Sequence, residues 1–327
     1  ATMKLNQVPG DLRDTPGQEL VGIIKSGPGW TGYLDYDTAV TDTTVDWLKQ
    51  RNNSTSDSRP FMMTVGFMLP HCPFIAPRED FDAYWPHITE DTLPKCDVSK
   101  MHPVHAYHRK VVSEIENEVP IDAQRRVRAA YYALVTYMDR QVQRILDTLK
   151  QTGLDKNTIV VYVSDHGEQL GEHGMWWKST FFEGSAGVPL IVSYPKELPQ
   201  GVTVKENVSL MDIGVTMLDL VGAKPLAGAS GRSFAGLLKG DKSTWLDEAI
   251  AEYNPRHATA SPCQRMVRRG PWKLCYYLGH KSQLFNIEDD PHELNDRIDD
   301  PACKAVVEEL TERALHNWDT RRIQRIM

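Results

Sequence analysis

The sequence predicts an α/β fold followed by a small antiparallel sheet with a helix packed against it. Amphipathic helices alternate with continuous β-branched runs up to about residue 222, and from there short segments separated by turns take over. We therefore expect two parts, residues 1–225 in a large α/β domain and residues 226–327 as a small α+β domain.

The strongest helix prediction covers residues 122–151. Apolar residues recur there at steps of three and four, and Gly153 supplies the stop. Helices are also expected at residues 37–50 and 209–222, and a capping box that starts at Ser209 marks the beginning of the second one.

Buried strands are expected wherever apolar, β-branched residues run on without alternation. The clearest run is "NTIVVYVS" at residues 157–164, which has the pattern of a central strand covered on both faces. The same reasoning predicts buried strands at residues 61–69 and 188–194. Residues 86–121, rich in proline and histidine, are expected to be an irregular excursion. Three of its histidines are interpreted as surface residues: His102, His105 and His108.

The last hundred residues have the pattern of a meander. Three segments rich in β-formers, residues 247–253, 264–277 and 283–296, are separated by turn residues, and a helix is expected from about Pro301 to His316. This pattern predicts the small sheet and its covering helix.

Length and composition describe a globular chain. With 327 residues, of which 41% are hydrophobic, the chain can bury a substantial core. The net charge of −7 is spread along the chain without a basic stripe, so we do not expect a nucleic-acid partner. There is no run of 18 apolar residues, and the start of the chain is polar and broken by proline. Neither a membrane span nor a signal peptide is therefore expected.

The cysteine pattern argues against a disulfide framework and against a zinc knuckle. Five cysteines are scattered without a CxxC pair, so reduced thiols are expected. Reduced thiols favour the cytoplasm, whereas a periplasmic or secreted location stays open. The cysteines are Cys72, Cys96, Cys263, Cys275 and Cys303.

Asp165 and His166 stand side by side where the strand predicted at residues 157–164 ends. Ligands of α/β sheets bind at the carboxyl ends of strands. A carboxylate and a neutral imidazole there suit a divalent metal, and the nitrogen favours manganese over calcium. The alternative is that Asp165 caps the following turn and that His166 has a structural role.

His71 and Lys178 are candidates for binding an anion. His71 follows the strand predicted at residues 61–69, and Lys178 lies in a glycine-rich loop. Both could stabilise charge on a transition state or on a leaving oxygen. Taken singly, each also fits a structural histidine or a solvated lysine. Trp176 and Trp177 could line such a pocket and hold a quaternary ammonium, or simply pack in the core.

The sequence resembles the sulfatases of the alkaline phosphatase superfamily. The resemblance rests on the long motif "VSDHGEQLGEHGMWWKSTFFEGSAGVPLIVSYP" and on the short motif "LPHCPF". Later pieces, "MVRRGPWKLCYY" and "QLFNIEDDPHELND", resemble the small C-terminal sheet of that family. An Asp followed by His, together with "WWKSTFFEGSA", is most similar to the branch of choline sulfatases and phosphonate monoester hydrolases.

The resemblance implies a central mixed sheet flanked by helices, and it implies roles for four residues. Asp165 and His166 would be two ligands of one divalent metal ion, Mn²⁺ or Ca²⁺. Lys178 would contact the sulfate and the ester oxygen, and His71 would contact the sulfate near the leaving group. The implied reaction is hydrolysis of a sulfate monoester of choline or of an aryl or alkyl alcohol. A phosphonate monoester or phosphodiester is the alternative substrate.

The sequence also departs from the family pattern. It lacks the early strand with paired aspartates and the C-x-P-x-R motif whose cysteine or serine becomes the formylglycine nucleophile. Three explanations stay open: a second polypeptide, a fragment of a longer enzyme, or a truncated, non-catalytic anion-binding protein. We favour a piece of a complete enzyme. This chain alone is then expected to be inactive and to need an N-terminal segment of the same enzyme as partner. A homo-oligomer stays open.

Overall fold

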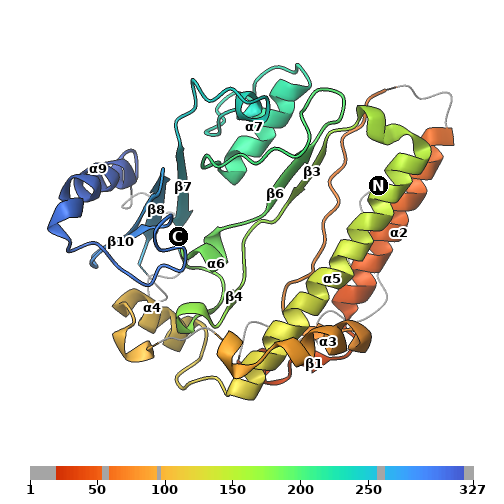
Figure 1. Cartoon of the computed structure of the whole chain (residues 1–327). Coiled ribbons are helices and arrows are strands. Elements are labelled where there is room, and N and C mark those ends of the chain that lie inside the picture. Colours follow the sequence, from red (N-terminus) through yellow and green to blue (C-terminus); the bar gives the residue numbers. More distant parts are fainter. Residues whose placement is uncertain (1–19, 54–58, 94–96, 256–261, 320–327) are drawn as a thin grey trace. The chain divides into compact units, whose positions relative to one another are not determined.

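The structure is a computed structural model that describes residues 20–53, 59–93, 97–255 and 262–319 (Figure 1). The polar start of the chain and Cys96 lie outside these ranges. The chain divides into two compact units, and the boundary expected at residue 225 falls inside the second unit and stays a prediction. The first unit comprises Ala1–Met101, Arg109–Val160 and Glu168–Trp177. The second comprises His102–His108, Val161–Gly167 and Lys178–Met327.

The first unit is built around three helices. Its α-helices and strands are α1 (Leu20–Ile24), β1 (Gly27–Pro28), α2 (Gly32–Asn53), β2 (Ile75–Ala76), α3 (Arg78–Tyr84), α5 (Ile121–Thr152), β4 (Gln169–Leu170) and β5 (Trp176–Trp177). Short helical turns occur at η3 (Trp85–His87), η4 (Glu90–Thr92), η5 (Val98–Lys100), η6 (His108–Val112), η7 (Leu154–Asn157) and η8 (Glu172–Gly174). The helices predicted at residues 37–50 and 122–151 are thus confirmed as α2 and α5.

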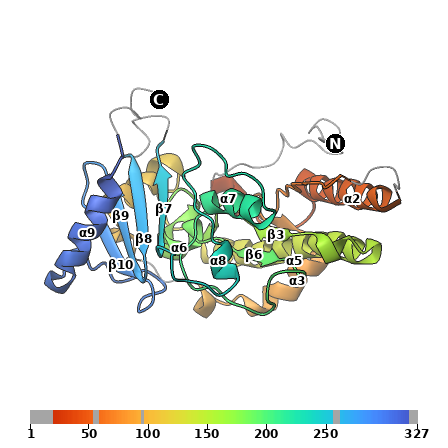
Figure 2. The ribbon, with the colours of Figure 1, turned by 90° about the horizontal axis from the view of Figure 1, so that it is seen from above.

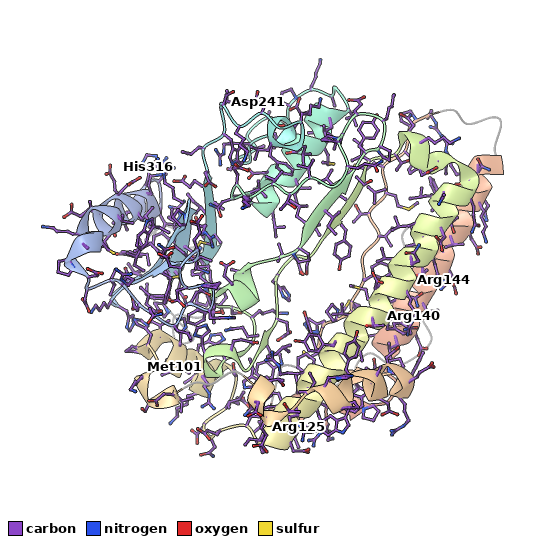
Figure 3. The ribbon with its side chains drawn as sticks, in the orientation of Figure 1. Met101, Arg125, Arg140, Arg144, Asp241 and His316 are labelled. Carbon is purple, nitrogen blue, oxygen red and sulfur yellow. The ribbon has the colours of Figure 1, made fainter. Side chains whose placement is uncertain are left out.

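Helix α5 packs against both α2 and α3 in this unit. It ends at Gly153, whose φ of 71° is the left-handed conformation that glycine adopts at helix ends. Two arginines of α5 reach neighbouring helices: Arg140 pairs with Asp80 of α3 at 2.7 Å, and Arg144 pairs with Asp42 of α2 at 2.5 Å. Figure 3 shows both arginines on α5. Such ion pairs fix orientation more than they stabilise, because pairs near the surface contribute only about 0–1 kcal/mol.

The buried strand predicted at residues 61–69 is wrong. This segment forms no strand, and Met62 in its middle is 93% exposed. The carboxylate of Asp37 on α2 accepts the N–H groups of Met68 at 2.8 Å and Leu69 at 3.0 Å. The sequence pattern did identify an extended apolar segment. A strand also needs a neighbouring strand for its backbone hydrogen bonds, and here the side chain of Asp37 accepts two of them instead.

The second unit holds the remaining elements. Its α-helices and strands are α4 (Pro103–Tyr107), β3 (Val160–Val163), α6 (Glu183–Ala186), β6 (Leu190–Ser193), α7 (Leu210–Leu220), α8 (Ala235–Leu238), β7 (Glu248–Tyr253), β8 (Gln264–Arg269), β9 (Trp272–Tyr277), β10 (Gln283–Asn286) and α9 (Lys304–Leu315). A 3₁₀ turn, η9 (Pro301–Cys303), precedes α9. Helix α7 begins with the predicted capping box, in which Ser209 and Asp212 bond each other's backbone.

The predicted C-terminal sheet is confirmed. Strands β10, β9, β8 and β7 lie in this order, and each neighbouring pair is antiparallel. Helix α9 covers one face of the sheet, as Figure 2 shows. The core between them consists of Val267, Leu274, Leu284, Cys303, Leu310 and Ala314. Burial of these side chains holds the helix on the sheet.

Strands β3 and β6 confirm two predicted strands but not their burial. In the described part of the chain they pair with each other in a two-stranded sheet. Ile191 is 60% exposed and Val163 is 38% exposed. Coverage of both faces requires a wider sheet and flanking helices, and two strands do not provide it.

Among the described residues, no helix is both long and apolar enough to cross a bilayer. The thiols of Cys72, Cys263, Cys275 and Cys303 are buried, and their reduced state stays a prediction.

Asp37 makes the stability of the first unit depend on pH. Burial raises its pKa from 3.8 to about 6, although the N–H groups of Met68 and Leu69 oppose the shift. Because the pKa is raised on folding, the folded protein binds more protons between these values. The contribution of Asp37 to the free energy of unfolding is thus fully present below pH 3.8 and is lost as the pH rises through about 6.

We expect Asp37→Asn to remove this dependence, because an amide does not ionise. The free energy of unfolding of the wild type minus that of the variant should fall by up to about 3 kcal/mol between about pH 4 and pH 7. Urea denaturation at several pH values measures it. The exposed Asp139→Asn is the control and should show no such trend. A difference independent of pH would contradict the role of Asp37.

Candidate functional site

The turn after β3 places Asp165 and His166 as the sequence predicts, at the end of a strand. The Asp165 side chain is 86% exposed, and its Oδ1 accepts the backbone N–H of His166 at 3.0 Å. The hydroxyl of Ser164 donates to the carbonyl of His166 at 2.8 Å, which closes the turn. The carboxylate is thus held by the backbone at one oxygen, and the other oxygen faces the imidazole.

The imidazole of His166 is oriented by its own backbone. Nδ1 lies 2.8 Å from the carbonyl oxygen of Gly167, and Nε2 lies 3.7 Å from Oδ2 of Asp165. A neutral ring that donates from Nδ1 has its lone pair on Nε2, which is the arrangement of a metal-binding histidine. Two ligands about 2.1 Å from one ion at a tetrahedral angle are about 3.4 Å apart. The observed separation therefore suits a shared cation.

Two donors do not make a complete metal site. In residues 20–53, 59–93, 97–255 and 262–319, no group of three or more His, Cys, Asp or Glu side chains is arranged to hold an ion. A structural or catalytic divalent site requires at least three or four ligands. Asp165 and His166 fit part of such a site, and the described residues do not fit all of it.

Gly167 packs this turn tightly against α6. Its N–H donates to the carbonyl of Ser185 at 2.7 Å. A Cβ on Gly167 would lie 2.3 Å from the carbonyl oxygen of Gly184, closer than any real contact. Only glycine permits this approach. The position of α6 therefore fixes the position of the turn.

Lys178 is half-buried in the loop that leads to α6. The residues on either side of it have left-handed backbones, Trp177 with φ 62° and Ser179 with φ 71°. Such conformations are unfavourable for residues other than glycine and gather at functional sites. The loop thus bends sharply at the lysine that the sequence singles out.

His71 lies in the first unit, just after Met68 and Leu69, whose backbone N–H groups bond to Asp37. The backbone N–H of His71 donates to the carbonyl of Met68 at 3.0 Å, and the ring Nδ1 lies 2.7 Å from the carbonyl oxygen of Cys72. The ring of Tyr33, on α2, stands edge-on to it with ring centroids 6.2 Å apart. Backbone and helix α2 together orient this imidazole.

The structure therefore brings Asp165 and His166 together and places Lys178 in the same unit. His71 belongs to the other unit, so the two groups are described separately. The catalytic and metal roles of these four residues stay predictions.

The neighbouring tryptophans are core residues. Trp176 and Trp177 are both 3% exposed, which favours the packing alternative over an exposed aromatic wall. Glu172 orients the same segment: its carboxylate pairs with Arg128 at 2.9 Å and accepts the N–H of Leu170 at 2.6 Å.

The surface interpretation of the histidines at residues 102–108 is wrong for two of them. His105 and His108 are each 3% exposed. Nε2 of His105 lies 3.1 Å from Oε1 of Gln283 and 3.1 Å from the hydroxyl of Tyr277. Burial lowers the pKa of His108 to about 4. The sequence places these residues in an irregular segment, but burial there depends on the C-terminal sheet, which lies far away in the sequence.

Sequence reasoning missed a buried charged cluster beside α6. Lys273 on β9 is fully buried, and its Nζ lies 2.7 Å from Glu183 and 2.6 Å from Glu293. Burial alone would lower the pKa of Lys273, but the carboxylates of Glu293 and Glu183 outweigh it and raise the pKa. Arg268 adds a second cation 3.3 Å from Glu183, so two cations face two carboxylates. A lysine in the apolar strand "WKLCYY" was the available signal.

Two family models match the chain. One, described as "Sulfatase", matches residues 11–223, and the other, described as "N-sulphoglucosamine sulphohydrolase, C-terminal", matches residues 171–319. Together they span both units and the long motif around Asp165.

Two relatives are identical to the chain at about a third of the aligned residues. A choline-sulfatase of Rhizobium meliloti (strain 1021) is 32% identical over 301 residues, covering 88% of this chain and 57% of that protein. Arylsulfatase K of Gallus gallus is 33% identical over 284 residues, covering 79% of this chain and 51% of that protein. The chain thus spans little more than half the length of these relatives.

The fold is similar to that of solved hydrolases. The phosphonate monoester hydrolase of Agrobacterium radiobacter superposes with a TM-score of 0.72 at 23% identity, covering 94% of this chain and 64% of that one. The α/β class predicted from the sequence agrees with this similarity.

We expect Gly167→Ala to destabilise the protein by about 1–3 kcal/mol, because the added Cβ must push Gly184 and α6 away. Thermal or urea unfolding measures the effect. The matched control is Gly214→Ala in α7, where a Cβ meets nothing within 4 Å. The control should stabilise by about 0.5–1 kcal/mol, since alanine favours helix. Equal effects at both positions would contradict the close packing of Gly167.

Proposed function

Because this chain belongs to the sulfatase family, we propose that the protein it forms part of hydrolyses a sulfate monoester of choline or of an aryl or alkyl alcohol. The observation that carries the proposal is the turn after β3, where Oδ2 of Asp165 and Nε2 of His166 lie 3.7 Å apart. The family match supplies the reaction class, and the choline-sulfatase and arylsulfatase relatives support the choice of substrates.

Lys178 and His71 are proposed as the catalytic residues of this chain. An ammonium that contacts the sulfate and the bridging ester oxygen stabilises the negative charge that develops there as the S–O bond breaks. An imidazole near the leaving group can give a proton to the departing alkoxide. The sharp bend of the backbone at Lys178 and the contacts of His71 with its own backbone support fixed positions for both groups.

Asp165 and His166 are proposed as two ligands of one divalent ion, Mn²⁺ or Ca²⁺. When bound, such an ion draws negative charge from the oxygens of the ester. The mixed oxygen and nitrogen donors support manganese over calcium. Since the described residues do not complete a site, further ligands must come from elsewhere in the protein.

An N-terminal segment of the same enzyme is proposed to supply those ligands and the formylglycine nucleophile. The two-stranded sheet of β3 and β6 supports it, because additional strands would pair with the outer edges of these two strands. The share of the relatives that the chain spans supports it as well. On this proposal the chain alone does not turn over substrate.

A phosphonate monoester or a phosphodiester is the second candidate substrate. The similarity in fold to the phosphonate monoester hydrolase favours it. A tetrahedral anion of this kind has the same demand for a cation and for hydrogen-bond donors.

We expect Asp165→Asn to weaken binding of Mn²⁺ by at least tenfold, because the amide carries no negative charge. Calorimetric titration of the metal-free, full-length protein with Mn²⁺ and with Ca²⁺ measures the affinity. Asp139→Asn on the exposed face of α5 is the matched control and should bind like the wild type. Unchanged affinity in Asp165→Asn would contradict the metal assignment.

We expect Lys178→Ala and His71→Ala to lower kcat by roughly 100- to 10,000-fold in the full-length protein, since each removes charge stabilisation or a proton donor. Turnover is measured with choline sulfate, an aryl sulfate and a phenyl phosphonate monoester. The exposed Lys224→Ala and His280→Ala are the controls. Faster turnover of the phosphonate would favour the second candidate, and full activity in either site variant would remove that residue from the proposal.

A further inference from the structure

Lys273 is a fully buried cation that the proposed chemistry does not use. Its Nζ lies 2.7 Å from Oε1 of Glu183, 2.6 Å from Oε1 of Glu293 and 2.6 Å from the carbonyl oxygen of Phe181. Two of these contacts are hydrogen bonds that the ammonium donates, to Glu183 and to Phe181, and the third is an ion pair with Glu293. A buried charge is tolerable only when it is paired and bonded in this way.

Two of the three partners of Lys273 lie on one short stretch of backbone. Phe181 and Glu183 flank the start of α6, and the backbone N–H of Glu183 also donates to Oε2 of Glu293 at 2.6 Å. Strand β9 and the turn that carries Glu293 therefore hold residues 181–183 from two sides. Side chains and backbone are both engaged, so this stretch cannot shift without breaking charged hydrogen bonds.

Helix α6 passes this constraint on to the turn after β3. Gly167 donates to Ser185 at 2.7 Å and packs on the carbonyl of Gly184 with no space for even a methyl group. The carbonyl of Gly167 in turn lies 2.8 Å from Nδ1 of His166. On the other side, Lys178 stands three residues before Phe181.

We propose that Lys273, together with Glu293, is a positioning residue that fixes the turn of Asp165 and His166 and the loop of Lys178 to the C-terminal sheet. The inference rests on the proposed function in one respect, namely that these three residues form part of the site. Lys273 acts on them through α6 and does not contact the substrate.

An ionic link has a consequence that an apolar contact would not have. Replacing a buried ion pair with apolar residues of similar size is often harmless for stability. The charged contacts, however, are directional and fix the register of residues 181–183 against β9. Their removal should therefore loosen α6 and the turn while the sheet itself stays folded.

The test uses a double variant, Lys273→Met with Glu293→Gln, which leaves Glu183 paired with Arg268. The control is Lys304→Met with Glu308→Gln on α9, an exposed pair 3.9 Å apart. Amide hydrogen exchange is followed in the full-length protein by mass spectrometry. We expect exchange in residues 165–187 to rise at least tenfold and residues 264–286 to keep their protection. The affinity for Mn²⁺ should fall roughly 10- to 100-fold.

Two results would overturn the proposal: unchanged exchange in residues 165–187, or an equal rise in residues 264–286, which would mean that Lys273 only stabilises the sheet. If the double variant does not fold, Glu293→Gln alone, which retains an amide acceptor for Lys273, is judged by the same comparison. If the wild type and Asp165→Asn bind Mn²⁺ equally, the proposed metal site fails. The exchange data still decide the role of Lys273 in that case.

Discussion

The contacts of one buried ammonium organise the second unit. Lys273 donates hydrogen bonds to Glu183 and to the backbone of Phe181, and it forms an ion pair with Glu293. Because a buried charge without partners is very costly, these groups can only move together. Helix α6 is therefore held on the C-terminal sheet, and through Gly167 it holds the turn that presents Asp165 and His166. The polar residues of the turn are ordered by contacts made elsewhere.

This arrangement explains why a small sheet follows the α/β part of the chain. The turn after β3 consists of polar residues and glycine from Ser164 to Gly167, and such a segment buries little apolar surface of its own. Order has to come from a rigid neighbour. Strands β8 and β9 provide one, because α9 covers a face of their sheet with Leu310 and Ala314. The sheet has its own hydrophobic core, and the ion pair between Lys273 of the sheet and Glu183 of α6 links the candidate site to it.

The sequence predicted what depends on neighbours along the chain and missed what depends on distant partners. Helix α5, the capping box at Ser209 and strands β7 to β10 follow from periodicity and turn residues, which act locally. The apolar run at residues 61–69 has the same local signal as a strand, but Asp37, about thirty residues away, binds its backbone. Lys273 is separated from Glu183 by 90 positions, and no spacing rule connects them. Asp165 and His166 could be found because they are adjacent at a strand end.

In the proposed metal site, the identity of the ion would depend on ligands beyond Asp165 and His166. One carboxylate oxygen and one imidazole nitrogen are compatible with manganese and, if oxygen donors follow, with calcium. Calcium takes six to eight oxygen ligands at about 2.4 Å, whereas a smaller ion accepts fewer and tolerates nitrogen. A single nitrogen among many carboxylates would still permit calcium, but a second nitrogen would exclude it in practice. On the proposed assignment, the remaining donors would decide the metal, while Asp165 and His166 would decide where it binds.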